Sequence, residues 1–390
     1  MKSNGMRGAL IRMFGCSIKS LAIFRITLAS LLLCELGLRF RFLHPFYSNE
    51  GTHPLKLLHL QTDNLYKFVC VHCYNDTMYF QSILLCTQVV LSLGMLVGYY
   101  TPICALLSWW LYVSLTLRNT WLNFILDRYF HYLLFYCAML PTHMVWSIDA
   151  NRMTNTESRS EGNNIIVSLA TVALKMQIFW IYIDAGVGKY MDPQRGWTWN
   201  PEPPLLPALD AYTRHTVGAQ YMYGLLGPEG LRFMSPIVVW LEMLAAPVAL
   251  MGLALDWPRL TNFAIIMICQ LHIGIAITVR NTVLLSLVAC VAWMSYLPDK
   301  CALIDQIHNL CSVETNSDRK EKKNSNSQTK LANKSSLNND LRNFAIVSII
   351  CGSIWFELFS EECNQSMKHI WSVLLHNRWN VFISSEEYVP

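Results

Sequence analysis

Nine apolar segments, each close to the length that crosses a bilayer, constrain this chain more than any other feature of its sequence. A transmembrane helix needs about 20 mostly apolar residues, and the bilayer core holds no water to satisfy an open backbone. The segments therefore predict an all-α, polytopic helical membrane protein. They cover residues 21–40, 81–98, 102–117, 129–145, 165–187, 236–255, 260–278, 282–297 and 344–359.

Composition extends this prediction to most of the chain. The sequence is 53% hydrophobic and only 14% charged, whereas soluble globular proteins carry about 25% charged residues. One transmembrane helix on a soluble domain would not lower the charge of the whole chain this far. Basic residues cluster at the N-terminus and in one tail, which is typical of cytosolic segments and not of a nucleic-acid surface. We therefore expect membrane lipid, and no nucleic acid, among the partners.

The order of polar and apolar stretches predicts four regions. Residues 1–18 form a basic, cytosolic N-terminus that continues into an uncleaved signal-anchor helix, because the first apolar segment is too long for a cleaved signal peptide. A core of about eight helices occupies residues 19–298. Residues 299–343, rich in Ser, Asn and Lys, form a flexible cytosolic linker, and residues 344–390 add a ninth transmembrane helix and a short lumenal tail.

Threading the helices from a cytosolic N-terminus places alternate loops in the lumen, namely 41–80, 118–128, 188–235 and 279–281. Two features agree with this topology. The basic run 319–323 falls in the cytosol, where such runs are enriched. Asn75 and Asn364, each in an N-x-S/T sequon, fall in the lumen, so we expect both to be glycosylated. Asn333, in a third sequon, falls in the cytosol and is expected to stay unmodified.

Most of the 13 cysteines lie inside apolar segments, where they act as small hydrophobic residues. The pair Cys70 and Cys73, in the sequence Cys-Val-His-Cys, lies outside such a segment. No second Cys or His pair accompanies it at zinc-binding spacing, so no metal site is predicted. Because Cys363 falls on the same predicted side, a disulfide from Cys70 or Cys73 to Cys363 is a candidate cross-link.

Polar side chains that could carry chemistry gather at the helix ends predicted to face the lumen. Ionisable groups at membrane depth are costly, and where they occur they usually mark a functional site. Glu242 is the exception, since it lies nearer the middle of its apolar segment and close to Pro247. The candidates are Arg118, Asn119, Asp127, Arg128, His131, Asp184, Lys189, Glu242, His272 and Arg280.

The residues alone leave two interpretations open for most of these candidates. Arginines at helix ends also extend to lipid headgroups, and an aspartate directly before a helix, such as Asp127, is a natural N-cap. His131 and His272 also suit hydrogen bonds between helices. Lys189 follows Ala-Gly-Val-Gly, where small residues let helices approach. There it either reaches the headgroups or is desolvated enough to act as a base.

A set of motifs resembles the transmembrane core of the vitamin K-dependent gamma-carboxylases and of the related horizontally transferred transmembrane domain (HTTM) proteins. The resemblance covers residues 18–298 and leaves out the large lumenal domain of the carboxylases. It rests on the motifs in their order and intervals. They are Leu21-Ala-Ile-Phe-Arg25, His44 to Gly51, Gly98-Tyr-Tyr-Thr-Pro102, Arg118-Asn119 with Asp127, Leu140-Pro141, Gln177-Ile-Phe, Ala185-Gly-Val-Gly-Lys189, Glu242 with Pro247, and His272 to Pro298.

This resemblance implies a multi-pass glycoprotein of the endoplasmic reticulum membrane, and a lyase that uses reduced vitamin K, oxygen and carbon dioxide. Its base is a lysine after an Ala-Gly-Val motif, and Lys189 matches that lysine. Near the start of the fourth helix, where the carboxylases have a histidine, this chain has Asp127, with His131 one turn later. These two residues would position or tune the base. The implied cavity residues are Arg118, Asn119, Asp184, Glu242 and His272.

The implied partners are an isoprenoid quinone and a peptide or protein glutamate. The main alternative is a non-catalytic membrane protein that binds lipid or isoprenoid with the same helical core. A transporter would be expected to show two repeated halves with paired broken helices. The sequence contains no evident internal repeat.

Overall fold

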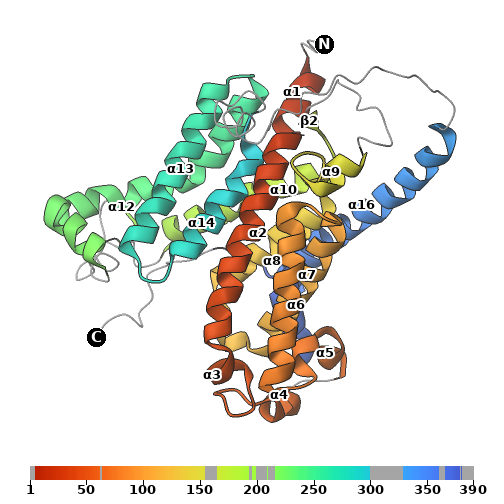
Figure 1. Ribbon diagram of the computed structural model, residues 1–390. Helices are drawn as coiled ribbons and strands as arrows, with labels where there is room; N and C mark the ends of the chain where they lie inside the picture. Colours follow the sequence, from red (N-terminus) through yellow and green to blue (C-terminus); the bar gives the residue numbers. More distant parts are fainter. Residues whose placement is uncertain are drawn as a thin grey trace.

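The protein is almost wholly helical in the computed structural model (Figure 1), which describes residues 5–61, 64–153, 165–192, 196–198, 209, 216–298, 328–359, 365–377 and 379. This confirms the predicted all-α class. Strands β1 (Cys16–Ser17) and β2 (Ile165–Ile166) pair antiparallel and tie the start of the chain to the start of α10. In chain order, the helices are α1 (Met6–Phe14), α2 (Ile18–Arg41), α3 (Leu43–Tyr47), α4 (Leu55–Gln61), α5 (Asn64–Val69), η1 (Val71–Cys73), α6 (Met78–Val97), α7 (Thr101–Arg118), η2 (Thr120–Leu122), α8 (Ile125–Met139), α9 (Ile148–Met153), α10 (Leu169–Tyr190), α12 (Val217–Ala254), α13 (Pro258–Thr278), α14 (Val283–Ala292), η3 (Trp293–Tyr296), α16 (Gln328–Phe359) and α17 (Gln365–Leu375).

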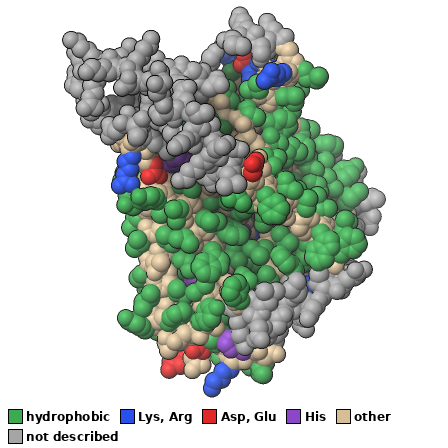
Figure 2. All heavy atoms as spheres, turned by 90° about the vertical axis from the view of Figure 1, so that its right-hand side faces the viewer, with side chains coloured by type: hydrophobic (Ala, Val, Ile, Leu, Met, Phe, Trp, Pro, Cys, Tyr) green, Lys and Arg blue, Asp and Glu red, His purple; other side chains and the backbone are tan. Residues whose placement is uncertain are grey.

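Each predicted apolar segment overlaps one of these helices. Within the described part of the chain, six helices are long and apolar enough to cross a membrane: α2, α6, α10, α12, α13 and the Asn339–Phe359 part of α16. Figure 2 shows a face on which hydrophobic side chains cover the middle of the molecule and charged side chains lie toward its two ends. Length, composition and this distribution together support a membrane-spanning protein.

Prolines set several of the helix boundaries. Helix α8 ends at Met139, before Pro141, because a residue preceding proline disfavours the helical conformation. Helix α7 begins next to Pro102, whose fixed φ suits a first turn. Between α6 and α7, Gly98 has φ 73°, and a Cβ there would overlap Ser147 and Arg25. The predicted tight turn is therefore present, and only glycine fits it.

Loops predicted to share a side of the membrane lie together in the structure. Asp149 donates its backbone N–H to the carbonyl of Gly98 at 2.9 Å, which joins the loops after α6 and α8. At the opposite end, Arg118 donates to the carbonyl of His53 at 2.9 Å, which joins the end of α7 to the loop before α4. Figure 1 shows α9 near the N-terminal end of the molecule and α3, α4 and α5 at the far end.

The linker prediction is wrong in its second part. Helix α16 begins at Gln328, so residues 328–343 are helical and continuous with the apolar segment that follows. Three leucines and two lysines in residues 328–343 have high helix propensity, and a helix already formed extends cheaply. Residues 299–327, with the basic run 319–323, lie outside the described residues.

The C-terminal region is part of the core, whereas the sequence suggested an appendage. Ile346 of α16 is 1% exposed, and Trp379, beyond α17, is also 1% exposed. The Trp379 ring contacts Tyr129 of α8 at a centroid distance of 4.8 Å. Asn377 accepts a hydrogen bond from Gln177 of α10 at 2.7 Å. The short tail therefore returns to the helices that surround the predicted site.

The predicted disulfide to Cys363 is also wrong, because the structure joins Cys70 and Cys73 to each other. The short helix η1 brings their Cα atoms to 5.2 Å, within the usual range for a disulfide. Cys363 lies outside the described residues. Between the two cysteines, burial lowers the pKa of His72 to about 3, and its Nδ1 lies 2.9 Å from the Ser114 hydroxyl of α7.

Peptide mapping without reduction is expected to recover Cys70 and Cys73 in one peptide that gains two hydrogens on reduction. The loop that this bond closes is short, so we expect the Cys70→Ser/Cys73→Ser variant to lose only about 2 kcal/mol of stability. Recovery of either cysteine cross-linked to Cys363 would contradict the pairing in the structure.

Candidate functional site

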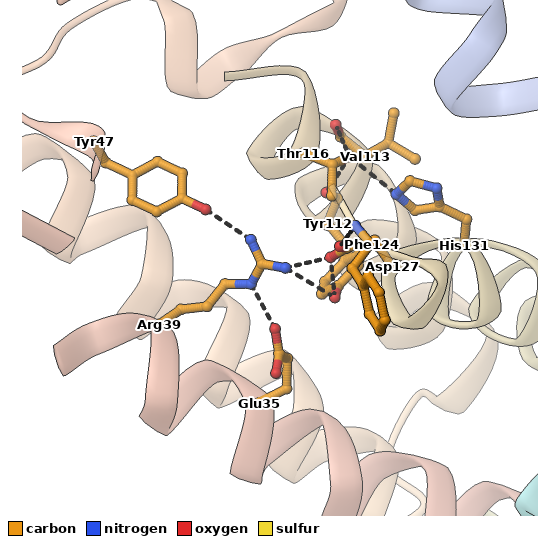
Figure 3. Close-up of polar contacts among 9 residues, drawn as sticks. All are labelled: Glu35, Arg39, Tyr47, Tyr112, Val113, Thr116, Phe124, Asp127 and His131. Atoms are coloured by element: carbon orange, nitrogen blue, oxygen red, sulfur yellow. Dashed lines mark hydrogen bonds and ion pairs between the residues drawn. The ribbon is translucent and has the colours of Figure 1, made fainter. Parts of the chain in front are cut away.

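The predicted site residues separate into two clusters. Lys189, Glu242 and His272 lie where α10, α12 and α13 meet, beside an apolar cavity. Asp127 and His131 lie at the start of α8, in a network centred on Arg39 of α2 (Figure 3). We define these as the lysine cluster and the arginine cluster.

Lys189 and Glu242 form a buried ion pair. The Lys189 side chain is 3% exposed, and its Nζ donates to Glu242 Oε2 at 2.6 Å. The ammonium also lies 5.4 Å from the centre of the Trp197 ring. Of the two interpretations that the sequence left open for Lys189, burial supports the desolvated one and argues against extension to the lipid headgroups. In this setting each charge depends on the other for its stability.

Gly186 explains how the two helices bring this pair together. It lies one turn before Lys189 on α10, and a Cβ at this position would overlap the Met243 side chain of α12. Because Gly186 has no side chain, the backbones of α10 and α12 approach each other at Met243. Met243 follows Glu242 in the sequence, so the same approach brings Glu242 near Lys189. The expectation that the Ala-Gly-Val-Gly motif permits close approach of a neighbouring helix is confirmed for this glycine.

The lysine cluster borders a cavity of about 310 Å³. Its polar lining includes the Lys189–Glu242 pair and Gln270, and nearly all of the remaining wall is apolar. The apolar wall comes from both halves of α12, from α13, and from Trp197 and Leu209. Lining side chains on the helices include Met222, Leu226, Leu231, Met234, Ile237, Val238, Leu241, Met267, Leu271 and Ile275.

A kink in α12 creates one side of this cavity. Gly227 has φ 63° and ψ 179°, and Pro228 follows it. Met222 before the kink and Met234 after it both line the cavity. Residues 188–235 were predicted to form a lumenal loop, which is wrong from Val217 onward, because α12 begins there. Gly227 and Pro228 bend this helix and leave both halves helical.

The Gly227→Ala variant is expected to be less stable than the wild type by about 1–3 kcal/mol, because that φ, ψ combination is essentially restricted to glycine. Gly224→Ala is the matched control. A Cβ meets no atom within 4 Å at either position, so the two variants differ in backbone strain alone. Thermal unfolding in detergent measures the difference. Equal melting temperatures for the two variants would contradict the strained kink.

His272 approaches the lysine cluster from α13, but it does not line the cavity, so that expectation for His272 is wrong. Its Nε2 lies 2.6 Å from the Tyr182 hydroxyl of α10, and the Tyr182 ring packs on Trp293 at 5.2 Å. This is the helix-to-helix bond that the sequence left open for His272. The other ring nitrogen, Nδ1, is buried and has no hydrogen-bond partner among the described residues.

Arg39 organises the arginine cluster (Figure 3). Its Nε donates to Glu35 Oε1 at 2.7 Å, and its Nη1 donates to the Tyr47 hydroxyl at 2.7 Å. Its Nη2 forms an ion pair with Asp127, which also accepts from the Tyr112 hydroxyl at 2.8 Å. One guanidinium thus joins α2, α3 and α8, and Tyr112 adds α7.

Asp127 and His131 both have structural partners. The prediction of Asp127 as an N-cap is wrong, because α8 begins at Ile125 and its N-cap is Phe124. Asp127 is the third residue of the helix, and its Oδ2 accepts from the backbone N–H of Phe124 at 2.8 Å, which closes the first turn. His131 Nε2 lies 3.0 Å from the Thr116 hydroxyl of α7, which is a bond between helices. Among the described residues, neither side chain contacts Lys189 and neither lines its cavity.

Arg118, Asn119 and Asp184 do not line the cavity beside Lys189. Arg118 is 0% exposed, so it does not extend to the headgroups, and it holds the loop before α4 through carbonyl contacts. Asn119 donates to the carbonyl of Phe46 at 3.0 Å. Asp184 accepts from the backbone N–H of Trp379. These three polar side chains therefore hold loops and the C-terminal tail against the helices.

Sequence reasoning missed Tyr182, Trp197 and Arg39 as parts of these clusters. Tyr182 lies seven residues before Lys189 and hence on the same face of α10, which is a usable signal. Arg39 and Glu35 stand four residues apart in the first apolar segment, and this spacing points to a local pair without indicating a partner on another helix. Trp197 lies in a Trp- and Pro-rich stretch that offers no periodic pattern.

The lysine cluster can hold a proton between two groups, exclude water and face an apolar molecule. Metal chemistry has no comparable support, since the described residues contain no group of three or more His, Cys, Asp or Glu able to hold an ion. The site rests on this geometry alone, because no family model, no curated protein and no solved structure matches the chain.

Proposed function

We propose that this chain is a carboxylase-like membrane enzyme that uses a reduced isoprenoid quinone such as vitamin K hydroquinone, with the Lys189–Glu242 pair as its base. Epoxidation of the quinone, or its coupling to gamma-carboxylation of a glutamate, is the proposed reaction. The observation that carries this proposal is a buried, charge-neutral acid–base pair in the wall of an apolar cavity.

The cavity suits such a molecule in size and polarity. Ligand sites usually have volumes of about 300–1,000 Å³, mostly apolar walls and a few placed polar groups. Here the volume is about 310 Å³ and the Lys189–Glu242 pair is the charged part of the wall. When bound, a reduced quinone supplies a phenolic hydroxyl on an apolar ring. Trp197 offers an aromatic surface beside the pair.

The pair can accept a proton without a change in the total charge of the site. Glu242 takes the proton at a carboxylate oxygen from a hydroxyl in the cavity and becomes neutral. The Lys189 ammonium, which lies 2.6 Å from that carboxylate in the resting pair, then neutralises the negative charge left in the cavity. One ion pair thus replaces another, which avoids the large cost of an isolated charge at low dielectric.

Other residues of the lysine cluster support this step by position. Tyr182 fixes the His272 ring through its hydroxyl, 2.6 Å from Nε2. The Gly186 contact sets the spacing of α10 and α12. Asp127 and His131 take no part in the proposed proton transfer. Asp127 binds Arg39 and His131 binds Thr116, and both contacts hold helices together.

The test compares wild type with Glu242→Gln, Lys189→Met and the double variant Lys189→Met/Glu242→Leu. Purified protein receives reduced vitamin K, labelled carbon dioxide and a glutamate-containing peptide, and quinone epoxide and labelled glutamate are measured. Epoxide from wild type and background values from all three variants are expected. The double variant removes both buried charges together and so leaves no unpaired charge. If it is stable but inactive, the loss of activity comes from loss of the base and not from unfolding. Background values in wild type would refute the enzyme.

A second candidate is a non-catalytic isoprenoid-binding protein, which the apolar cavity also favours. It predicts that oxidised vitamin K quenches Trp197 fluorescence in wild type and in the double variant alike, with no epoxide from either. Activity in wild type that the double variant lacks would exclude it.

We place the protein in the endoplasmic reticulum membrane with its N-terminus in the cytosol. Asn75 is exposed before α6, on the side proposed to be lumenal. We expect glycosidase treatment to lower the apparent mass of wild type, and Asn75→Gln to remove a glycan. Modification at Asn333 in place of Asn75 would invert the topology.

A further inference from the structure

Gln270 of α13 is an unusual member of the cavity wall beside Lys189. The outer face of α13 carries a stripe of exposed apolar side chains that recur every three or four residues, and Gln270 lies in that stripe between Ile266 and Ile273. Both isoleucines are more than half exposed, at 55% and 54%. Gln270 is exposed as well, and it also lines the cavity. An amide therefore lies where its neighbours along the stripe are hydrocarbon.

The depth of Gln270 makes this position costly. At about 1.5 Å of rise per residue, Gln270 lies about 18 Å from the start of α13 and about 12 Å from its end at Thr278. A glutamine side chain is too short to reach the headgroups over that distance, unlike a lysine or arginine near a helix end. A polar group in an apolar environment costs free energy unless it forms a hydrogen bond. In the described part of the chain, the Gln270 amide has no such bond.

The space beside Gln270 can admit a ligand. Gly274, one turn further along α13, also lines the cavity, and a Cβ at this position would meet no described atom within 4 Å. Among the described residues, nothing fills the space next to the amide. The Lys189–Glu242 pair lines the same cavity of about 310 Å³ from α10 and α12. The cavity thus presents two kinds of polar group to one ligand, a charged pair and a neutral amide.

We infer that Gln270 is a specificity-determining residue whose amide forms a hydrogen bond to a ring oxygen of the bound quinone. This inference rests on the proposed function, because it takes a quinone as the ligand. The amide N–H donates to a carbonyl oxygen of the oxidised ring, and the amide oxygen accepts from a hydroxyl of the reduced ring. The Lys189–Glu242 pair and Gln270 then hold two oxygens of one ring. Such a site prefers a ring with oxygens to an apolar ring of the same shape, because the apolar ring leaves the amide unpaired.

The test measures binding and needs no catalysis. Menadione, the ring of vitamin K without its chain, and methylnaphthalene, the same ring without its two oxygens, compete with tritiated vitamin K quinone for the full chain in one detergent. The measured quantity is the ratio of their two affinities. Wild type is expected to favour menadione, and Gln270→Leu is expected to lower the ratio about five- to tenfold, as loss of one hydrogen bond predicts. The affinity for methylnaphthalene should stay the same or rise.

Asn262→Leu is the matched control, since it makes the equivalent change on the same helix outside the cavity. It should keep the wild-type ratio. Gln270→Met, which preserves the shape of the side chain and removes the amide, should repeat the result of Gln270→Leu. Melting temperatures without ligand verify that each variant is folded. An equal ratio in wild type and in both Gln270 variants would overturn the inference.

Failure of the proposed function is a separate outcome, because the epoxide assay runs on the same proteins. Epoxide from wild type together with an unchanged ratio in the Gln270 variants would refute the role of Gln270 alone. A lowered ratio in those variants, with no epoxide from wild type, would refute the enzyme and support the Gln270 contact. If the tritiated quinone does not bind wild type, both are refuted.

Discussion

Lys189→Met is expected to lower the free energy of unfolding by about 3–5 kcal/mol, the usual cost of removing one partner from a buried ion pair. Glu242 is 8% exposed at its side chain, so removal of the ammonium leaves a largely buried carboxylate without its charge partner. Glu242→Gln should cost less, because it leaves an amide that can still accept a hydrogen bond from Lys189. Denaturation of the purified protein in mixed micelles measures both changes.

The double variant Lys189→Met/Glu242→Leu should recover most of the stability lost by Lys189→Met. Replacing a buried ion pair by apolar side chains of similar volume is often neutral or stabilising. This outcome would show that the pair is retained for a reason other than stability, as a base would be. If the double variant is as unstable as Lys189→Met, the loss comes from packing around the lysine, and the coupling of the two charges is refuted.

The sequence predicted the helices well because bilayer length and apolar composition are local properties. It also singled out Lys189 and the small residues before it, since a charged residue in an apolar segment is visible without any structure. Glu242, the partner of Lys189 in the ion pair, was not predictable as its partner in the same way. Lys189 and Glu242 are 53 residues apart in the chain. Their contact depends on how α10 and α12 pack, which Gly186 permits but does not specify.

The same limit explains the errors in the arginine cluster. Asp127 has the sequence signature of an N-cap, but it lies at the third position of α8, where its carboxylate accepts the N–H of the actual N-cap, Phe124. Asp127 and Arg39 are 88 residues apart in the chain, and no local sequence pattern predicts their ion pair. The resemblance implied that Arg118 lines a cavity, yet its carbonyl partners come from a loop that has no periodic signal.

The C-terminal tail shows a different limit. Its residues 365–379 follow the last membrane-length helix and are too few to suggest a domain. The structure places Trp379 against Tyr129 and over the Arg128 guanidinium, at 5.5 Å from the ring centre. Trp379 lies beyond the amphipathic helix α17 and outside its periodic pattern, so packing against the core decides its position.

Arg39→Met is expected to have an effect at least as large as the lysine variant, about 3–5 kcal/mol or more, because it leaves two buried carboxylates without their cation. The side chains of Glu35 and Asp127 are 8% and 5% exposed. Arg41→Met is the matched control on the same helix. Arg41 is exposed and its guanidinium lies over Phe42 at 5.8 Å, so its loss should change stability by no more than about 0.5 kcal/mol.

Adding Glu35→Gln and Asp127→Asn to Arg39→Met should restore most of the stability. Both changes remove a buried charge, and asparagine can still accept the Phe124 N–H bond that begins α8. Thermal unfolding of the four proteins, at one detergent concentration and one pH, decides the outcome. If Arg39→Met costs no more than Arg41→Met, the arginine cluster does not hold α2, α7 and α8 together. The burial of Asp127 would then need an explanation other than its two contacts, the hydrogen bond that closes the first turn of α8 and the ion pair with Arg39.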